Sequence, residues 1–201
     1  MLLRLNDPAF YAIGILLAGA MIFAPIVLAY RQQADGMQNI IESGIDAGFD
    51  RLQSLVAGPG IVTSVAANAN GGQSVVVLAE NRLGDPVIVS SAGAFIPLTR
   101  RELEVVQGHS LQVEFHVSAA PGSEAGQVNL GLFQRGIGQN GWQLVDIPAD
   151  GQPISVTLTP PQCEAEYFFI GLWPATLGEP GAIQLDRIRI EMLEPIECGG
   201  Q

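Results

Sequence analysis

The sequence contains no lysine, only two histidines and only two cysteines. All nine basic residues are arginines, against twenty acidic residues, and the formal net charge is −11. A surface of this sign repels nucleic acids and anionic lipid head groups, so we expect no binding to nucleic acid. Two cysteines exclude a multi-cysteine metal cluster and a dense disulfide scaffold.

The motifs of common catalytic sites are also missing. There is no Gly-x-Ser-x-Gly elbow, no His-Glu-x-x-His pair, no P-loop, and no Gly-x-Gly-x-x-Gly that follows a strand and opens a helix. Two histidines and no lysine leave few acid–base groups, and no spacing among the carboxylates marks a glycosidase pair. We therefore expect a protein that is not an enzyme.

What the sequence does contain is one long apolar segment near its start. Residues 8–30 form a run of twenty-three residues without a charged side chain. At about 1.5 Å per residue, a helix of this length crosses a hydrocarbon core of roughly 30 Å. Asp7 and Pro8 suit its first turn. The sequence predicts a short cytoplasmic N-terminus over 1–7 and a transmembrane helix over 8–30.

A cleaved signal peptide is the alternative, with Val27-Leu28-Ala29 as its cleavage pattern. The apolar run is longer than the usual signal-peptide core of about 7–15 residues, and Pro25 interrupts its end, so we expect the segment to be kept. The basic residues on its two sides differ by about one charge. The short N-terminal flank and the two cysteines therefore decide the orientation. For a Gram-negative host, we expect a single-pass inner-membrane protein with a periplasmic C-terminal domain.

Small residues within this segment would allow another helix to approach closely. Gly14, Ala18 and Gly19 form a patch at i, i+4 spacing, which is typical of contacts between membrane helices. Glycine and alanine are also simply common in such helices. The partners that this patch implies are other membrane protein subunits, within the lipid bilayer.

The next segment, residues 31–58, shows apolar residues at helical spacing. Ile41, Ile45, Phe49 and Leu52 recur at intervals of three and four, with polar residues between them. The pattern predicts an amphipathic stalk helix over 31–58. Either the protein's own β-domain or a neighbouring subunit would cover its apolar stripe, and the pattern leaves both open.

From residue 59 onward the spacing changes to short alternating runs bounded by glycine, proline, asparagine or aspartate. In the clearest run, Leu111–Val117, every second residue is apolar. The runs predict an antiparallel β-sandwich over 59–194, followed by a C-terminal tail over 195–201. The predicted strands are 61–66, 74–79, 87–90, 103–106, 111–117, 127–133, 142–147, 154–158, 167–173 and 183–192.

Several short motifs follow one another in the second half of the chain. Gln107-Gly108-His109-Ser110 precedes LQVEFHV, and VNLGLF, Gly141-Trp142, YFFIGLWP and a closing IQLDRIRIE come after it. This order resembles the jelly-roll carbohydrate-binding modules of the galactose-binding-like class. In that class an acidic residue in the last strand often precedes a shift of the apolar phase, so a bulge is expected near Asp186 and Arg187. The resemblance covers about 61–193 and implies a jelly-roll β-sandwich.

The resemblance also implies aromatic side chains that stack on sugar rings. The candidates are Trp142, Tyr167, Phe169 and Trp173, of which the last three share one face of a predicted strand. The other face of that strand is apolar as well. The alternative is therefore a central strand that is buried on both faces.

Metal sites have little support in the sequence. The resembling modules often hold a structural calcium, for which Glu80, Asp85 and Glu102 are available, but no calcium-loop pattern is present. His116 and Glu114 share one face of their strand, which supplies at most two ligands. We expect no other cofactor.

The two cysteines, Cys163 and Cys198, allow one disulfide. In an oxidising compartment such a bond would pin the C-terminal tail to the domain. Two free buried thiols are the alternative.

Together these features favour a non-catalytic, single-pass membrane protein that serves as an accessory or scaffold subunit of a larger membrane complex. Its β-sandwich would then pack on the outer face of that complex. The alternative is a membrane-tethered glycan-binding module that uses the aromatic residues, and an unrecognised hydrolase is a third hypothesis.

Overall fold

The computed structural model describes residues 17, 21–26, 29, 36–68, 71–83, 93–134, 141–160, 163, 165–175 and 181–197. The chain divides into two units, Met1–Glu42 and Ser43–Gln201. Every described residue of the first unit is helical.

Most of the predicted transmembrane helix, including Gly14, Ala18 and Gly19, lies outside the described residues. In the part of the chain that is described, no helix has both the length and the apolar character needed to cross a membrane.

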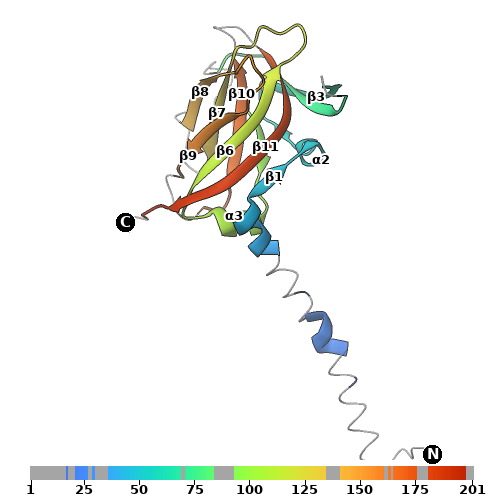
Figure 1. Cartoon of the computed structure of the whole chain (residues 1–201), viewed down its shortest axis with the longest axis vertical. Coiled ribbons are helices and arrows are strands. Elements are labelled where there is room, and N and C mark those ends of the chain that lie inside the picture. Colours follow the sequence, from blue (N-terminus) through green and yellow to red (C-terminus); the bar gives the residue numbers. More distant parts are fainter. Residues whose placement is uncertain are drawn as a thin grey trace, which may run out of the picture. The chain divides into compact units, whose positions relative to one another are not determined.

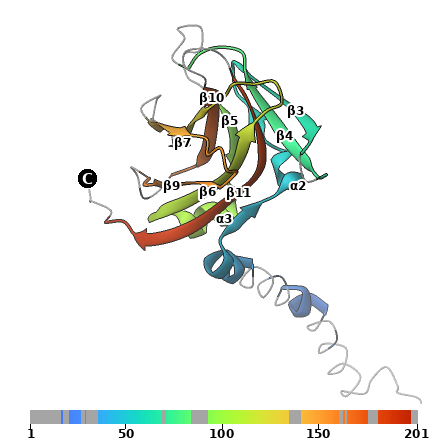
Figure 2. The same ribbon diagram turned by 45° about the horizontal axis from the view of Figure 1, so that its top comes forward.

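The second unit is built from two antiparallel sheets (Figures 1 and 2). We call the two sheets A and B. The strands of sheet A, in spatial order, are β3 (Ile61–Ala67), β4 (Gln73–Ala79), β11 (Ala182–Pro195), β6 (His109–Ala119) and β9 (Ile154–Leu158). A sixth strand of sheet A, β1 (Ile45–Ala47), also pairs with β11. Sheet B contains β2 (Val56–Ala57), β5 (Ala94–Pro97), β10 (Phe169–Ala175), β7 (Gln127–Phe133) and β8 (Trp142–Asp146). The predicted β-sandwich is thereby confirmed in its general form.

Alternating apolar side chains of both sheets form the core. Phe115 of β6 and Ile188 of β11 belong to sheet A, and Leu130 and Ile170 belong to sheet B; all four are at most 1% exposed. Burial of one such side chain contributes about 1.5–3 kcal/mol. The alternation predicted for Leu111–Val117 is confirmed, because its apolar members are buried and the residues between them are half-buried.

The predicted bulge in the last strand is also present. The pairing of β11 with β6 shifts its register between Leu185 and Arg187. The buried positions change phase at the same point, from Leu185 to Ile188. The side chain of Asp186 accepts hydrogen bonds from Ser74 Oγ and from Asn68 Nδ2, the latter at 3.1 Å.

The strand predicted over 103–106 is wrong, because Arg100–Val106 forms the helix α3. Thr99 Oγ1 accepts from the Glu102 N–H, and the Glu102 carboxylate accepts from the Thr99 N–H, which makes a capping box. This Thr-x-x-Glu signal marks a helix start and was overlooked in favour of the apolar run that follows it. The strand predicted over 87–90 lies outside the described residues.

The stalk helix predicted over 31–58 is wrong from Gly44 onward. Residues 36–43 are helical, but β1 follows, and then a single helical turn, α2 (Phe49–Leu52). Gly44 and Gly48 each weaken a helix by about 1 kcal/mol relative to alanine. Pairing of β1 with β11 offers the backbone an alternative set of hydrogen bonds.

The apolar stripe of the predicted stalk belongs to the β-domain instead. Ile45 is 3% exposed and Leu52 is fully buried, while Phe49 is half-buried. Ile41 is 54% exposed. The domain therefore begins at Ser43 rather than at residue 59, and its own core covers most of the stripe.

Gly44 occupies a position that only glycine fits. Its φ is +74°, and a Cβ built there would lie 2.4 Å from the carbonyl oxygen of Ile190. Left-handed backbone conformations are costly for residues with a side chain. Gly71 has a similar φ of +78° but nothing within 4 Å of its Cβ position.

We predict that Gly44→Ala lowers the free energy of unfolding by about 2 kcal/mol or more, because it adds a steric clash to the backbone strain. Gly71→Ala is the matched control. It adds backbone strain without a clash, so it should lower the free energy of unfolding by only about 1 kcal/mol. Urea unfolding followed by tryptophan fluorescence measures both. Equal losses in the two variants would contradict the close contact with Ile190.

Candidate functional site

The two faces of sheet B differ. Ile170, Leu172 and Leu130 point into the core and are at most 1% exposed. The opposite face, which we call the aromatic face, is assembled from β5, β10, β7, β8 and the residues just before β10. Its aromatic members are Phe95, Phe133, Trp142, Tyr167, Phe169 and Trp173.

Two glycines lie side by side in the middle of the aromatic face. Gly171 is opposite Phe95 on one side and opposite Gly131 on the other, and Gly131 is opposite Trp142. A Cβ at Gly131 would lie 2.9 and 3.0 Å from two ring atoms of Phe133. The missing side chain therefore leaves room for this ring to lie across the sheet.

On one side of the glycine pair, three aromatic rings are in contact. The ring centroids of Tyr167 and Phe169 are 4.7 Å apart with an interplanar angle of 18°, and those of Phe169 and Phe95 are 4.6 Å apart. All three side chains are half-buried. They form a row of rings that keeps part of its surface in contact with solvent.

On the other side, Trp142 packs against two more rings. It meets Phe133 edge to face with centroids 4.6 Å apart, and Trp173 in the same manner at 6.5 Å. Trp142 is half-buried, and its Nε1 is buried without a hydrogen-bond partner in the described structure. Trp173 is 1% exposed, so its ring is not presented to solvent in this structure and packs against Trp142 instead.

Polar groups occupy one end of the aromatic face. Asn129 is opposite Trp173 and is 8% exposed. Gln127 and Asp146 are paired across β7 and β8, and the Gln127 amide donates to the Asp146 carboxylate at 2.9 Å. An apolar platform with a few polar groups beside it is the usual composition of a small-ligand site.

The sequence prediction missed Phe95 and Phe133. Phe133 closes a strand that was predicted with its observed bounds, whereas the run around Phe95 was not assigned to any strand. The alternation of Ala94–Pro97 is only four residues long, which is too short for periodicity to distinguish it from a loop.

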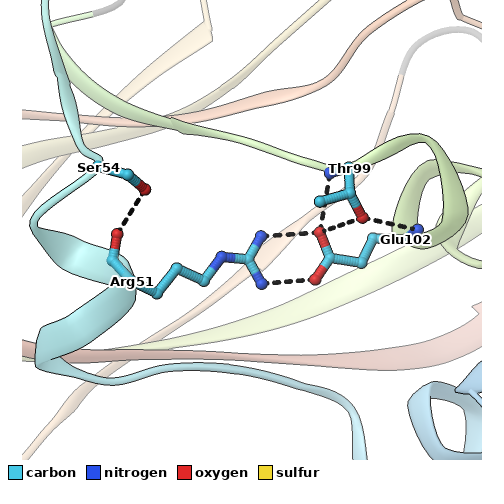
Figure 3. Close-up of polar contacts among 4 residues, drawn as sticks. All are labelled: Arg51, Ser54, Thr99 and Glu102. Carbon is cyan, nitrogen blue, oxygen red and sulfur yellow. Dashed lines mark hydrogen bonds and ion pairs between the residues drawn. The ribbon is translucent and has the colours of Figure 1, made fainter.

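Glu102, a predicted calcium ligand, is engaged elsewhere. Arg51 donates to both of its carboxylate oxygens, at 2.5 and 2.7 Å, and Thr99 donates through its N–H and its hydroxyl (Figure 3). Burial by itself raises the pKa of Glu102, but these donors outweigh it and hold the pKa below its usual value of 4.5. The ion pair ties α2 to α3 and engages both carboxylate oxygens of Glu102.

The other predicted metal ligands do not assemble either. Glu80 is exposed, and Asp85 lies outside the described residues. Glu114 and His116 share the solvent face of β6, as predicted, beside Arg189 and Arg187 of β11. Among the described side chains, no three of histidine, cysteine, aspartate and glutamate are grouped as a metal site would need.

Cys163 is disulfide-bonded. Cys198 is the other cysteine of the sequence, and it lies outside the described residues. The pairing of Cys163 with Cys198 stays a prediction. Free buried thiols are excluded for Cys163.

Comparison with known proteins shows the fold. No family model matches the sequence, and no curated protein matches it. The CBM22-1 xylan-binding domain of Paenibacillus barcinonensis Xyn10C is 17% identical over 75% of this chain and 94% of that domain, with a TM-score of 0.49. The CBM22-1-CBM22-2 tandem domain of the same protein is 18% identical over 76% of this chain, with a TM-score of 0.50.

This chain spans 46% of the length of that tandem domain. A CBM4 structure is 11% identical over 67% of this chain and 95% of that one, with a TM-score of 0.34. The likeness to the tandem domain, at a TM-score of 0.50 and 18% identity, shows a shared fold and no more. The resemblance to jelly-roll carbohydrate-binding modules is therefore confirmed for the fold of the β-domain.

We predict that the Arg51–Glu102 pair makes the free energy of unfolding fall as the pH is lowered into the acid range. Because the pKa of Glu102 is lowered in the folded protein, its contribution is complete above pH 4.5 and is lost as the pH falls through the lower, folded-state pKa. Glu102→Gln should cost about 3 kcal/mol at pH 7 and weaken this acid dependence. Urea unfolding at a series of pH values measures both effects.

Glu104→Gln is the matched control. Glu104 pairs with Arg100 at 3.2 Å on the exposed side of the same helix, so its loss should cost less than about 0.5 kcal/mol. If Glu102→Gln and Glu104→Gln behave alike at every pH, the ion pair is not the source of the dependence.

Proposed function

We propose that the protein is a non-catalytic glycan-binding module that holds a carbohydrate chain on the aromatic face. The contacting rings of Tyr167, Phe169 and Phe95 carry this proposal. The apolar faces of sugar rings stack on aromatic side chains, which supply a large contact area at low cost in conformational entropy.

Two polar groups beside the rings support the proposal. Among the described residues, the Nε1–H of Trp142 has no hydrogen-bond acceptor, and leaving such a donor buried costs about 1–3 kcal/mol. Asn129 lies in the next cross-strand row. A glycan hydroxyl can both donate and accept, so it is a suitable partner for either group once it reaches them.

The negative charge of the protein narrows the class of polysaccharide that we expect it to bind. The chain carries a formal net charge of −11, which disfavours association with acidic polysaccharides. On the aromatic face, the Asp146 carboxylate adds a negative group. A neutral polysaccharide is therefore the proposed ligand.

The apolar segment 8–30 supports a tether in this proposal. Its length and lack of charge suit a single-pass anchor that holds the β-domain outside the cytoplasm, in the periplasm of a Gram-negative cell. The disulfide at Cys163 supports an oxidising compartment.

The accessory-subunit hypothesis has less support. One of its supports was the amphipathic stalk as a docking surface, but Ile45 and Leu52 are buried within the protein's own β-domain. Its remaining basis is the lack of a catalytic motif and the patch of Gly14, Ala18 and Gly19, which lies outside the described residues. We keep it as the second candidate because that patch is still present in the sequence.

We predict that Phe169→Ala lowers the affinity for a neutral polysaccharide about tenfold or more, because it removes the central ring of the row. Affinity electrophoresis of the full chain in mild detergent, with soluble xylan, mixed-linkage β-glucan and hydroxyethylcellulose in the gel, measures this loss. Phe49→Ala is the matched control, since Phe49 is a half-buried phenylalanine outside the aromatic face. Mobility that no polysaccharide retards would refute the proposed function.

We predict that the full chain stays with membranes after carbonate extraction, because an apolar helix of this length is not released by high pH. Deletion of residues 8–30 should release it. Purification in mild detergent then separates the two candidate functions. A stoichiometric partner subunit, with no retardation by polysaccharide, would favour the accessory subunit.

A further inference from the structure

We infer that the Cys163 disulfide and the side chain of Gln107 together position Tyr167, so that the aromatic face is complete only in the oxidised protein. This inference rests on the proposed function, because it concerns how that face is regulated.

Tyr167 lies outside the hydrogen-bonded part of sheet B. β10 begins at Phe169, and just before it the Leu98 N–H donates to the Phe168 carbonyl at 3.2 Å. The Tyr167 ring stacks on the ring of Phe169. The backbone that carries Tyr167 therefore needs support from outside the sheet.

Gln107 supplies one such support. Its side-chain amide donates to the carbonyl oxygen of Ala165 at 2.8 Å, in a partly buried position. Gln107 is itself held at the end of α3, where its backbone N–H donates to the Leu103 carbonyl at 3.0 Å. A side chain fixed to the helix end thus holds the backbone two residues before Tyr167.

The disulfide supplies the second support. Cys163 lies four residues before Tyr167 and is disulfide-bonded. The end of β11 is tied to the same part of the fold, because the Ile196 N–H donates to the Gly108 carbonyl at 2.8 Å. Cys198 follows Ile196 by two residues. A bond from Cys163 to Cys198 would therefore join two segments that Gln107 and Gly108 already hold close to each other.

Loss of either support lowers the fraction of molecules in which the Tyr167 ring lies against Phe169. If only a fraction of the molecules has a complete binding face, the apparent affinity equals the intrinsic affinity multiplied by that fraction. The β-core does not depend on these supports, since β10 is paired along its length with β7 and over its first four residues with β5. Reduction should therefore weaken binding without unfolding the domain.

We predict that Gln107→Ala, and reduction of the wild-type protein, each lower the affinity for soluble xylan or mixed-linkage β-glucan about three- to tenfold. The double variant Cys163→Ser/Cys198→Ser should match the reduced protein. Gln112→Ala is the matched control, because the Gln112 amide donates to Ser155 Oγ at 2.9 Å on sheet A. In a Tyr167→Ala background, neither reduction nor Gln107→Ala should lower the affinity further, because the ring they position is gone.

Amide hydrogen exchange of the full chain in mild detergent gives a measurement that needs no ligand. Reduction or Gln107→Ala should accelerate exchange at residues 165–168 while residues 171–173 of β10 stay protected. A general loss of protection, in place of this local one, would overturn the inference, and so would unchanged exchange in both regions.

The outcomes separate the inference from the proposed function. If Phe169→Ala weakens binding while reduction and Gln107→Ala do not, the glycan-binding function stands and the inference is overturned. If no polysaccharide retards the wild-type protein, the proposed function fails, whatever the exchange shows. Additive losses in the Tyr167→Ala background would also overturn the inference, because they would act through another residue.

Discussion

The pairing of β11 organises the whole β-domain. This fourteen-residue strand pairs with β6 along most of its length, with β4 over residues 182–185 and with β1 over residues 188–190. The bulge after Leu185 separates these two stretches and changes which side chains face the core. A strand without the bulge would turn half of its apolar residues toward solvent, because side chains alternate between the two faces. Both the core and the attachment of the N-terminal segment depend on this bulge.

The segment over residues 43–57 differs most from the structure that its sequence predicts. It contains apolar residues at intervals of three and four, which favours a helix when the sequence is considered alone. In the structure the same segment forms three short elements in succession, which are β1, α2 and β2. The spacing of apolar residues cannot reveal these short strands. They form because β1 pairs with β11 and β2 pairs with β5, and both partners are distant in the sequence.

Strands that alternate over several residues could be predicted well. Gln127–Phe133 and Ile154–Leu158 have the bounds that the sequence indicated, and the bulge in β11 followed from a change of apolar phase. The candidate site was harder to predict. Which aromatic residues share a face depends on strand register and strand order, so Phe95 and Phe133 were missed. The burial of Trp173 depends on its neighbours across the sheet, which its own strand does not specify.

The two short strands of the segment over residues 43–57 have a mechanical consequence. β1 belongs to sheet A and β2 belongs to sheet B, so residues 44–57, which directly follow the helix at 36–43, are joined to both layers in turn. A pulling force applied at Gly44 by a fixed anchor would be shared between the two sheets and the ion pair of Arg51 with Glu102. The β-domain would thus resist being peeled apart layer by layer.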